Sequence, residues 1–131
     1  MVVVDTAIWV DYLAGVKTLA TAALEGLIDD RQAAYTGVVL AELMRGMRTE
    51  DERSGLDLEL SGARFLDMGV STWRRAGAIA QDLDVRGLRM PMSDAFVAAL
   101  VLEAGHELFT RDKHFERIPG LRLYKPEGDT Q

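Results

Sequence analysis

Short apolar runs alternate with longer helical patterns along the whole chain, and this alternation constrains the fold more than any other sequence feature. The runs at residues 2–4, 33–36, 65–68 and 107–110 have the length of strands, and a further short strand is expected at 121–124. Strands that alternate with helices are typical of α/β domains built on a parallel sheet. We therefore predict an α/β fold around a mainly parallel sheet.

Helix signals fill the segments between these strands. The helices that we expect span residues 6–13, 18–28, 38–47, 72–85 and 94–104. Ser71 and Ser93 stand where N-caps are favoured, and Gly105 stands where a helix would end. The last of these helices is apolar nearly all round, which is typical of a buried helix. The polar segment 48–54 is expected to form a loop or a hinge.

Several apolar side chains fit more than one role. Two stripes at helical spacing, suited to either a core or a dimer interface, are Leu40/Leu43/Met44/Met47 and Trp73/Ala76/Gly77/Ala80/Leu83. The aromatic side chains that we interpret as core, and not as platforms for stacking bases, are Trp9, Phe65, Trp73 and Phe96.

Composition limits the classes of protein that fit. The 131 residues suit one domain, which we place at 1–124, and the segment 125–131 has no apolar residue and is expected to fray. A net charge of −6 argues against a protein that only grips phosphates, because such binding needs excess positive charge. The absence of cysteine excludes disulfides and thiolate metal sites. No signal peptide or membrane-length apolar run is visible, so we expect a cytoplasmic protein without a membrane segment.

Acidic residues follow two of the predicted strands. Asp5 comes directly after the first strand, and Asp112 closely follows the strand at 107–110. Ligands of open parallel sheets bind outside the carboxyl ends of the strands, so the two carboxylates approach each other if these strands are neighbours. Asp94 stands in the first turn of the most apolar helix, where the helix dipole alone would favour an acid. Glu42 fits either a solvated face or a contact with the sheet edge.

These acids offer oxygen ligands without sulfur and without paired imidazoles. His106 and His114 have no partner at metal-binding spacing and are interpreted as surface or helix-end residues. The phosphate-loop, dinucleotide-binding and nucleophile-elbow motifs are all absent from the sequence. Carboxylates alone favour a hard divalent cation, Mg²⁺ or Mn²⁺, which binds through a few carboxylates together with substrate phosphates.

Four sequence blocks, spread over nearly the whole chain, carry a resemblance to a known family. The blocks are Val4-Asp5-Thr6 with Trp9 soon after, Val39-Val-Leu-Ala-Glu42-Leu-Met-Arg-Gly46, Ser93-Asp94-Ala-Phe-Val-Ala-Ala99 and Leu108-Phe-Thr-Arg-Asp112-Lys-His-Phe115. With these blocks in this order, the chain resembles the PIN-domain nucleases, and among them the VapC-type toxins of bacterial toxin–antitoxin pairs. The chain does not depart from the family pattern at any of the four acids.

The resemblance implies a PIN-like, doubly wound sheet of four or five mainly parallel strands flanked by helices. It implies that Asp5, Glu42, Asp94 and Asp112 converge on Mg²⁺, for which Mn²⁺ would substitute, and that the chain is an endoribonuclease. In this activity the metal activates a water for attack on phosphorus, and the products carry a 5′-phosphate and a 3′-hydroxyl. The resemblance further implies an RNA substrate, a cognate antitoxin and a homodimer.

Hydroxyl and basic side chains lie next to the acids in sequence. Asp5 and Asp94 are expected to be the most direct metal ligands, and Thr6 and Thr110 are expected to orient carboxylates or water. The basic residues that could hold the RNA backbone, meet an acidic antitoxin segment or remain ordinary solvated charges are Arg45, Arg48, Arg111 and Lys113.

Two other classes of protein share features with this sequence. A receiver-like phosphoacceptor domain also places acids at strand ends, but it needs an acidic pair after the first strand, and this chain has only Asp5 there. The second alternative is a PIN-like domain that only binds a partner. The complete set of four acids argues against that alternative.

Overall fold

The structure is a computed structural model, in which residues 1–128 are described. Its strands are β1 (Val2–Val4), β2 (Ala33–Thr36), β3 (Arg64–Leu66) and β4 (Glu107–Phe109). Its helices are α1 (Thr6–Leu13), α2 (Leu19–Asp29), α3 (Gly37–Arg45), α4 (Glu50–Glu59), α5 (Val70–Val85) and α6 (Met92–Ala104), followed by a 3₁₀ turn at Lys113–Arg117. The predicted α/β class is therefore confirmed.

The four strands form one parallel sheet in the order β3-β2-β1-β4. Val3 of β1 is paired with Ala34 on one side and with Leu108 on the other. The first and the last of these strands in the sequence, β1 and β4, are therefore neighbours in the sheet. This pairing brings the carboxyl ends of these two strands together, as the position of their acids required.

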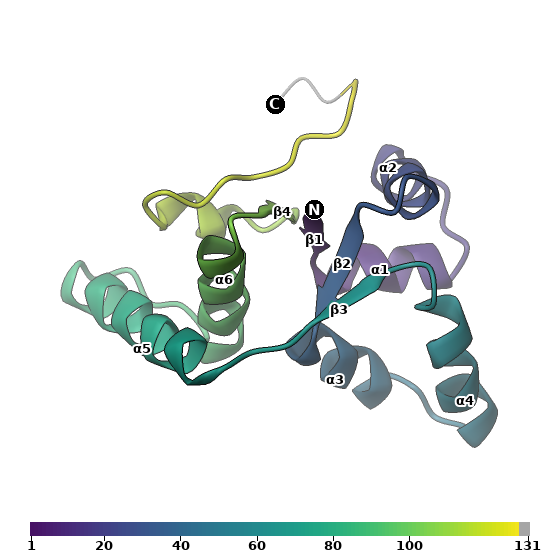
Figure 1. Cartoon of the computed structure of the whole chain (residues 1–131), viewed down its shortest axis with the longest axis horizontal. Coiled ribbons are helices and arrows are strands. Elements are labelled where there is room, and N and C mark those ends of the chain that lie inside the picture. Colours follow the sequence, from purple (N-terminus) through teal and green to yellow (C-terminus); the bar gives the residue numbers. More distant parts are fainter. Residues whose placement is uncertain (129–131) are drawn as a thin grey trace.

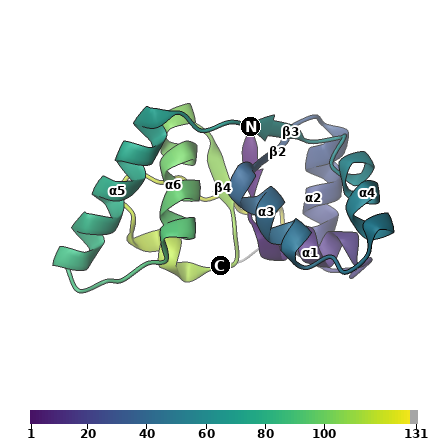
Figure 2. The same cartoon turned by 90° about the horizontal axis from the view of Figure 1, so that it is seen from below.

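Helices cover both faces of the sheet, as Figures 1 and 2 show. Successive residues of β1 point to opposite faces. Val2 and Val4 pack with side chains of α1 to α4, whereas Val3 packs with side chains of α5 and α6. Helix α6 is buried along most of its length, as its uniformly apolar sequence predicted. The molecule is therefore the doubly wound, three-layer arrangement that was expected.

The segment predicted as a polar loop is wrong in part, because helix α4 occupies residues 50–59. The Thr49 hydroxyl accepts a hydrogen bond from the Glu52 backbone nitrogen at 3.1 Å, and the acids of the first turn favour the positive end of the helix dipole. Leu56 and Leu60, one turn apart, are buried in the core. Two buried leucines in an otherwise polar helix gave too weak a periodic signal.

Three other element boundaries differ from the predictions. The caps predicted at Ser71 and Ser93 are wrong, since Gly69 precedes α5 and Pro91 precedes α6. Pro91 suits this place because its fixed φ of −57° leads the chain into the helix. The strand expected at 121–124 is reduced to a single parallel bridge between Leu123 and Leu108.

The carboxyl-terminal segment predicted to fray is described only as far as residue 128. Pro126 within it is buried against the domain. The remainder of that predicted tail, residues 129–131, lies outside the described residues. Among the described residues, no helix has the length and apolar character needed to cross a membrane.

Two of the aromatic side chains predicted to be core are instead exposed. Trp9 is fully buried, as predicted, and packs edge-on against Tyr12. Phe65, on the edge strand β3, is 44% exposed, and Trp73, near the start of α5, is 47% exposed. Trp73 keeps one contact, an edge-to-face packing with Phe96 at 4.8 Å between ring centroids. Strand edges and helix starts leave one side of such rings without a covering layer.

Candidate functional site

Asp5 lies where β1 ends and α1 begins. Its Oδ1 accepts a hydrogen bond from the Thr6 backbone nitrogen at 2.9 Å, so the carboxylate caps α1. Its Oδ2 accepts a hydrogen bond from the Thr110 hydroxyl at 2.7 Å. Thr110 directly follows β4, so the pairing of β1 with β4 creates this contact. The Thr110 hydroxyl therefore fixes one oxygen of this carboxylate.

Glu42 reaches the same place from α3. The Thr6 hydroxyl donates a hydrogen bond to Glu42 Oε1 at 2.6 Å. The side chain of Glu42 is exposed, and it nevertheless contacts a residue of the site. Of the two interpretations that the sequence left open, the solvated face is the one observed, and the bond of Glu42 is to the first residue of α1 and not to the sheet edge.

Asp112 stands in the turn after β4. The Asp112 backbone nitrogen donates to the Thr110 hydroxyl at 3.1 Å, so Thr110 connects Asp5 to Asp112. Asp112 Oδ1 accepts from the His114 backbone nitrogen at 2.9 Å, and the His114 Nδ1 lies 3.1 Å away from the same oxygen. The contact between Asp112 and His114 was not predicted from the sequence. An imidazole two residues after an acid, at the start of a tight turn, was the only available signal.

Asp94, in the first turn of α6, is near enough to the other three acids for their charges to shift its pKa. Its pKa is raised from the ordinary 3.8 to about 6, chiefly because burial disfavours the charged form. The negative charges of Asp5, Asp112 and Glu42 raise the pKa further, whereas the nearby His114 lowers it. The four acids predicted from the sequence are thus brought within electrostatic reach of one another.

The pKa of Asp5 is also raised, with burial again the largest cause. Hydrogen bonds from Thr110 and from the Thr6 backbone stabilise the carboxylate and oppose this rise. The charges of Glu42 and Asp112 add to it. Two partly buried acids of one cluster therefore hold protons more tightly than usual, and such shifted pKa values are typical of functional sites.

The donor set is that of a hard divalent cation, with carboxylate oxygens from four separate elements. Among residues 1–128, no three acidic or imidazole side chains already lie close enough together to share one ion directly. Mg²⁺ keeps several of its waters and binds proteins through one or two carboxylates, with the others reached through water. The residues therefore fit a hydrated Mg²⁺ or Mn²⁺ better than a tightly caged metal.

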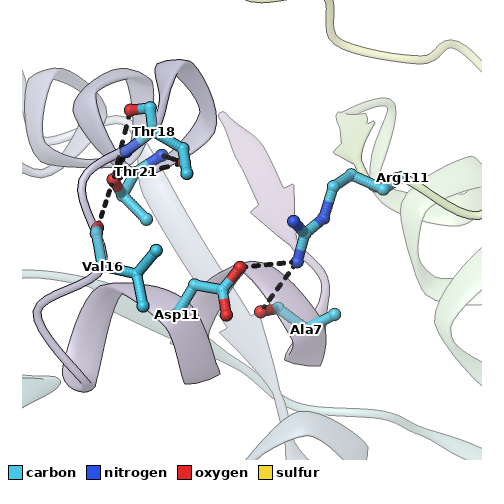
Figure 3. A network of polar contacts seen from close by, with 6 residues as sticks. All are labelled: Ala7, Asp11, Val16, Thr18, Thr21 and Arg111. Carbon is cyan, nitrogen blue, oxygen red and sulfur yellow. Dashed lines mark hydrogen bonds and ion pairs between the residues drawn. The ribbon is translucent and has the colours of Figure 1, made fainter.

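Arg111, one of the four basic residues expected near the site, is already bound within the protein. Its Nη2 donates to Asp11 Oδ2 at 2.9 Å and to the Ala7 carbonyl oxygen at 3.3 Å, as Figure 3 shows. This pair joins the turn after β4 to α1. Figure 3 also shows the start of α2, where the hydroxyl and backbone groups of Thr18 and Thr21 bond reciprocally. The other three basic residues, Arg45, Arg48 and Lys113, are exposed.

A doubly wound parallel sheet with acids from four elements gathered near the carboxyl ends of β1 and β4 is typical of a PIN domain. The model of the PIN domain family matches residues 2–121, and the chain belongs to this family. This membership excludes the receiver-like alternative. The chain is 30% identical over 105 residues to Ribonuclease VapC2 of Rickettsia felis, a match that covers 76% of this chain and 78% of that protein.

Two solved structures show how far the likeness extends. The chain is similar to the crystal structure of VapBC2 from Rickettsia felis bound to a DNA fragment from their promoter, with a TM-score of 0.81, 26% identity, and coverage of 95% of this chain and 98% of that one. It is also similar in fold to a toxin–antitoxin complex from Klebsiella pneumoniae, with a TM-score of 0.77, 24% identity, and coverage of 95% and 99%.

Proposed function

We propose that the chain is an endoribonuclease dependent on Mg²⁺ or Mn²⁺. The observation that carries the proposal is the gathering of four acids, in which burial and then the charges of the other three acids raise the pKa of Asp94 to about 6. A cluster of carboxylates whose negative charges repel one another is suited to bind a divalent cation. The similarity to Ribonuclease VapC2 supports RNA as the substrate. When bound, the cation supplies neutralisation of the cluster and activation of a water for attack on phosphorus.

The four acids and the neighbouring threonine have different roles around this cation. Asp5 and Asp94 hold it, since burial raises the pKa of both acids and a bound cation would offset the cost of burying their charges. Thr110 fixes one oxygen of Asp5 and leaves the other to its helix cap. Asp112 and Glu42 are further ligands or orient water.

We propose in addition that the chain acts as the toxin of a toxin–antitoxin pair and forms a homodimer. Its similarity to the VapBC2 structure and to the Klebsiella pneumoniae toxin–antitoxin complex supports an antitoxin partner. The homodimer is what the family resemblance implies, and the exposed rings of Phe65 and Trp73 are candidates for its interface. Sedimentation of the purified chain tests the dimer, and a monomer at all concentrations contradicts it.

The test of the nuclease uses the full chain without its partner. Purified protein is incubated with structured RNAs in Mg²⁺, Mn²⁺ or EDTA, next to the variants Asp5→Asn and Asp29→Asn. Asp29 is exposed at the end of α2 and serves as the matched control. We expect cleavage with either metal by the parent and Asp29→Asn, and none with EDTA or by Asp5→Asn. Cleavage by Asp5→Asn at the parental rate refutes the site, and no metal-dependent cleavage favours the alternative of a partner-binding domain.

A further inference from the structure

Two cavities flank the acidic cluster, and their charges differ in sign. The cavity beside Glu42, between α1, α3 and α4, has a volume of about 520 Å³. Its charged lining residues are all acidic: Glu42, Asp51, Glu52 and Glu59. The cavity beside Asp112 has a volume of about 350 Å³, and its charged lining residues are Arg111, Lys113, Lys125, Asp112 and Glu116. Of these two cavities, the one beside Asp112 is the one that basic side chains line.

The cavity beside Asp112, which we call the Tyr124 cavity, combines an aromatic wall with apolar and cationic groups. Tyr124 lines it and is supported from behind by Phe109, with the ring centroids 5.0 Å apart. Leu19, at the first position of α2, also lines it and is 54% exposed, so its apolar side chain is open to a ligand in the cavity. The size of the cavity falls in the range of about 300–1,000 Å³ in which proteins hold small ligands.

The cations at this cavity are not equally available. Arg111 is engaged by Asp11 and by the Ala7 carbonyl oxygen, so its guanidinium serves the fold. Lys113 and Lys125 are exposed, and they belong to segments on opposite sides of Tyr124 in the chain order. Two exposed ammonium groups around one aromatic ring, next to the acid at Asp112, make a site for a base with its phosphates.

We propose that the Tyr124 cavity binds a nucleotide of the RNA substrate next to the phosphate that is cleaved. The base stacks on Tyr124 and contacts Leu19, and the adjoining phosphates pair with Lys113 and Lys125. RNA reaches the acids from this side because the cavity beside Glu42 carries only negative charges, which repel phosphates. The inference rests on the proposed function, since its ligand is the substrate of that activity.

The test measures RNA binding without cleavage. Every protein carries Asp5→Asn, and the affinity for fluorescein-labelled single-stranded oligouridylate and oligoadenylate is measured by anisotropy in Mg²⁺ over a range of salt concentrations. For single strands, each phosphate contact contributes about −0.7 to the slope of log K against log salt. We expect Lys113→Gln with Lys125→Gln to make this slope shallower by about 1.4. The control Lys17→Gln removes an exposed lysine at another cavity and leaves the slope unchanged.

The ring is tested separately. Loss of base stacking costs enough to weaken binding about tenfold, so we expect that decrease for Tyr124→Leu, with the salt slope unchanged. Tyr124→Phe keeps the ring and restores the parental affinity. Far-ultraviolet circular dichroism shows whether each variant is folded. If Tyr124→Leu does not fold, the lysine variants still test the cavity. A parental slope in the double lysine variant, or parental affinity in a folded Tyr124→Leu, overturns the assignment.

The result separates this inference from the proposed function. A parent chain that cleaves RNA, with unaltered binding in these variants, refutes the Tyr124 cavity and leaves the nuclease intact. A parent chain that binds through the cavity and does not cleave refutes the nuclease and leaves the cavity as a nucleotide site.

Discussion

Replacing Asp94 by asparagine should stabilise the protein when no divalent metal is present. The pKa of Asp94 lies above its ordinary value because the folded chain buries the carboxylate beside three other acids. At neutral pH the folded protein must still hold this negative charge, and the unfolded chain holds it at no such cost. The variant Asp94→Asn removes the charge and keeps nearly the same shape.

The magnitude follows from the pKa. A rise from 3.8 to about 6 corresponds to roughly 3 kcal/mol between the charged and neutral forms. Asp94 is only partly buried, so we take about half of this for solvent screening, or roughly 1.5 kcal/mol. The first-turn acid also gains about 0.5 kcal/mol from the dipole of α6, which the variant loses. The expected net gain is about 1 kcal/mol at pH 7.

The sign of the pH dependence is fixed by the same shift. Between pH 4 and pH 6 the folded state of the parent binds more protons than the unfolded state, so its stability falls as the pH rises. The advantage of Asp94→Asn should therefore grow from nothing below pH 4 to its full value above pH 6. Urea unfolding in EDTA at several pH values measures it, with Asp51→Asn, a first-turn acid of α4, as the control for the dipole alone.

The electrostatic reasoning is refuted by either of two results. The first is an Asp94→Asn variant that is less stable than the parent at pH 7 in EDTA. The second is an advantage of that variant that does not change between pH 4 and pH 7, because a constant gain would come from packing and not from charge.

Three further predictions concern the metal, two glycines and one ion pair. Millimolar Mn²⁺ should raise the melting temperature of the parent chain, and an indifferent melting temperature would count against the carboxylate site. Gly62→Ala should destabilise the fold by about 1–3 kcal/mol, because its added methyl would lie 2.7 Å from Ile28 Cγ2. Gly77→Ala should stabilise the fold by about 0.5–1 kcal/mol, because Gly77 lies inside α5 with open space around it. Equal effects of the two substitutions on urea unfolding would contradict this. Arg111→Gln should cost less than about 1 kcal/mol in the same assay, because its pair with Asp11 is half exposed, and a larger loss would show that the pair does more than join α1 to the turn after β4.

The acids could be found from the sequence because of where parallel strands end. Asp5 and Asp112 each follow a short apolar run, and one rule of open parallel sheets brings such residues to a common edge. The rule required β1 and β4 to be neighbours, which the sequence could not show and the sheet order supplies. The positions of Asp94 and Glu42 depended on the family resemblance, since an acid in a helix has more ordinary explanations.

Other features escaped the sequence because they depend on contacts between distant segments. Arg111 and Asp11 are separated by most of the chain, so their pairing could not be expected from local charge. The helix at residues 50–59 buries only Leu56, with Leu60 directly after it, and its polar composition concealed it. The Tyr124 cavity is made from α2, the end of β4 and the carboxyl-terminal segment, which only the folded chain brings together.

The source of the oxygen in the cleaved product shows whether a water held at the acidic cluster attacks the RNA phosphate. The parent chain is incubated with RNA and Mn²⁺ in water enriched in heavy oxygen, and the products are analysed by mass spectrometry. The account predicts a 3′-hydroxyl and a 5′-phosphate that carries one solvent oxygen, because water attacks phosphorus when the acidic cluster holds its cation. Products that end in a 2′,3′-cyclic phosphate, or cleavage that continues in EDTA, would contradict it.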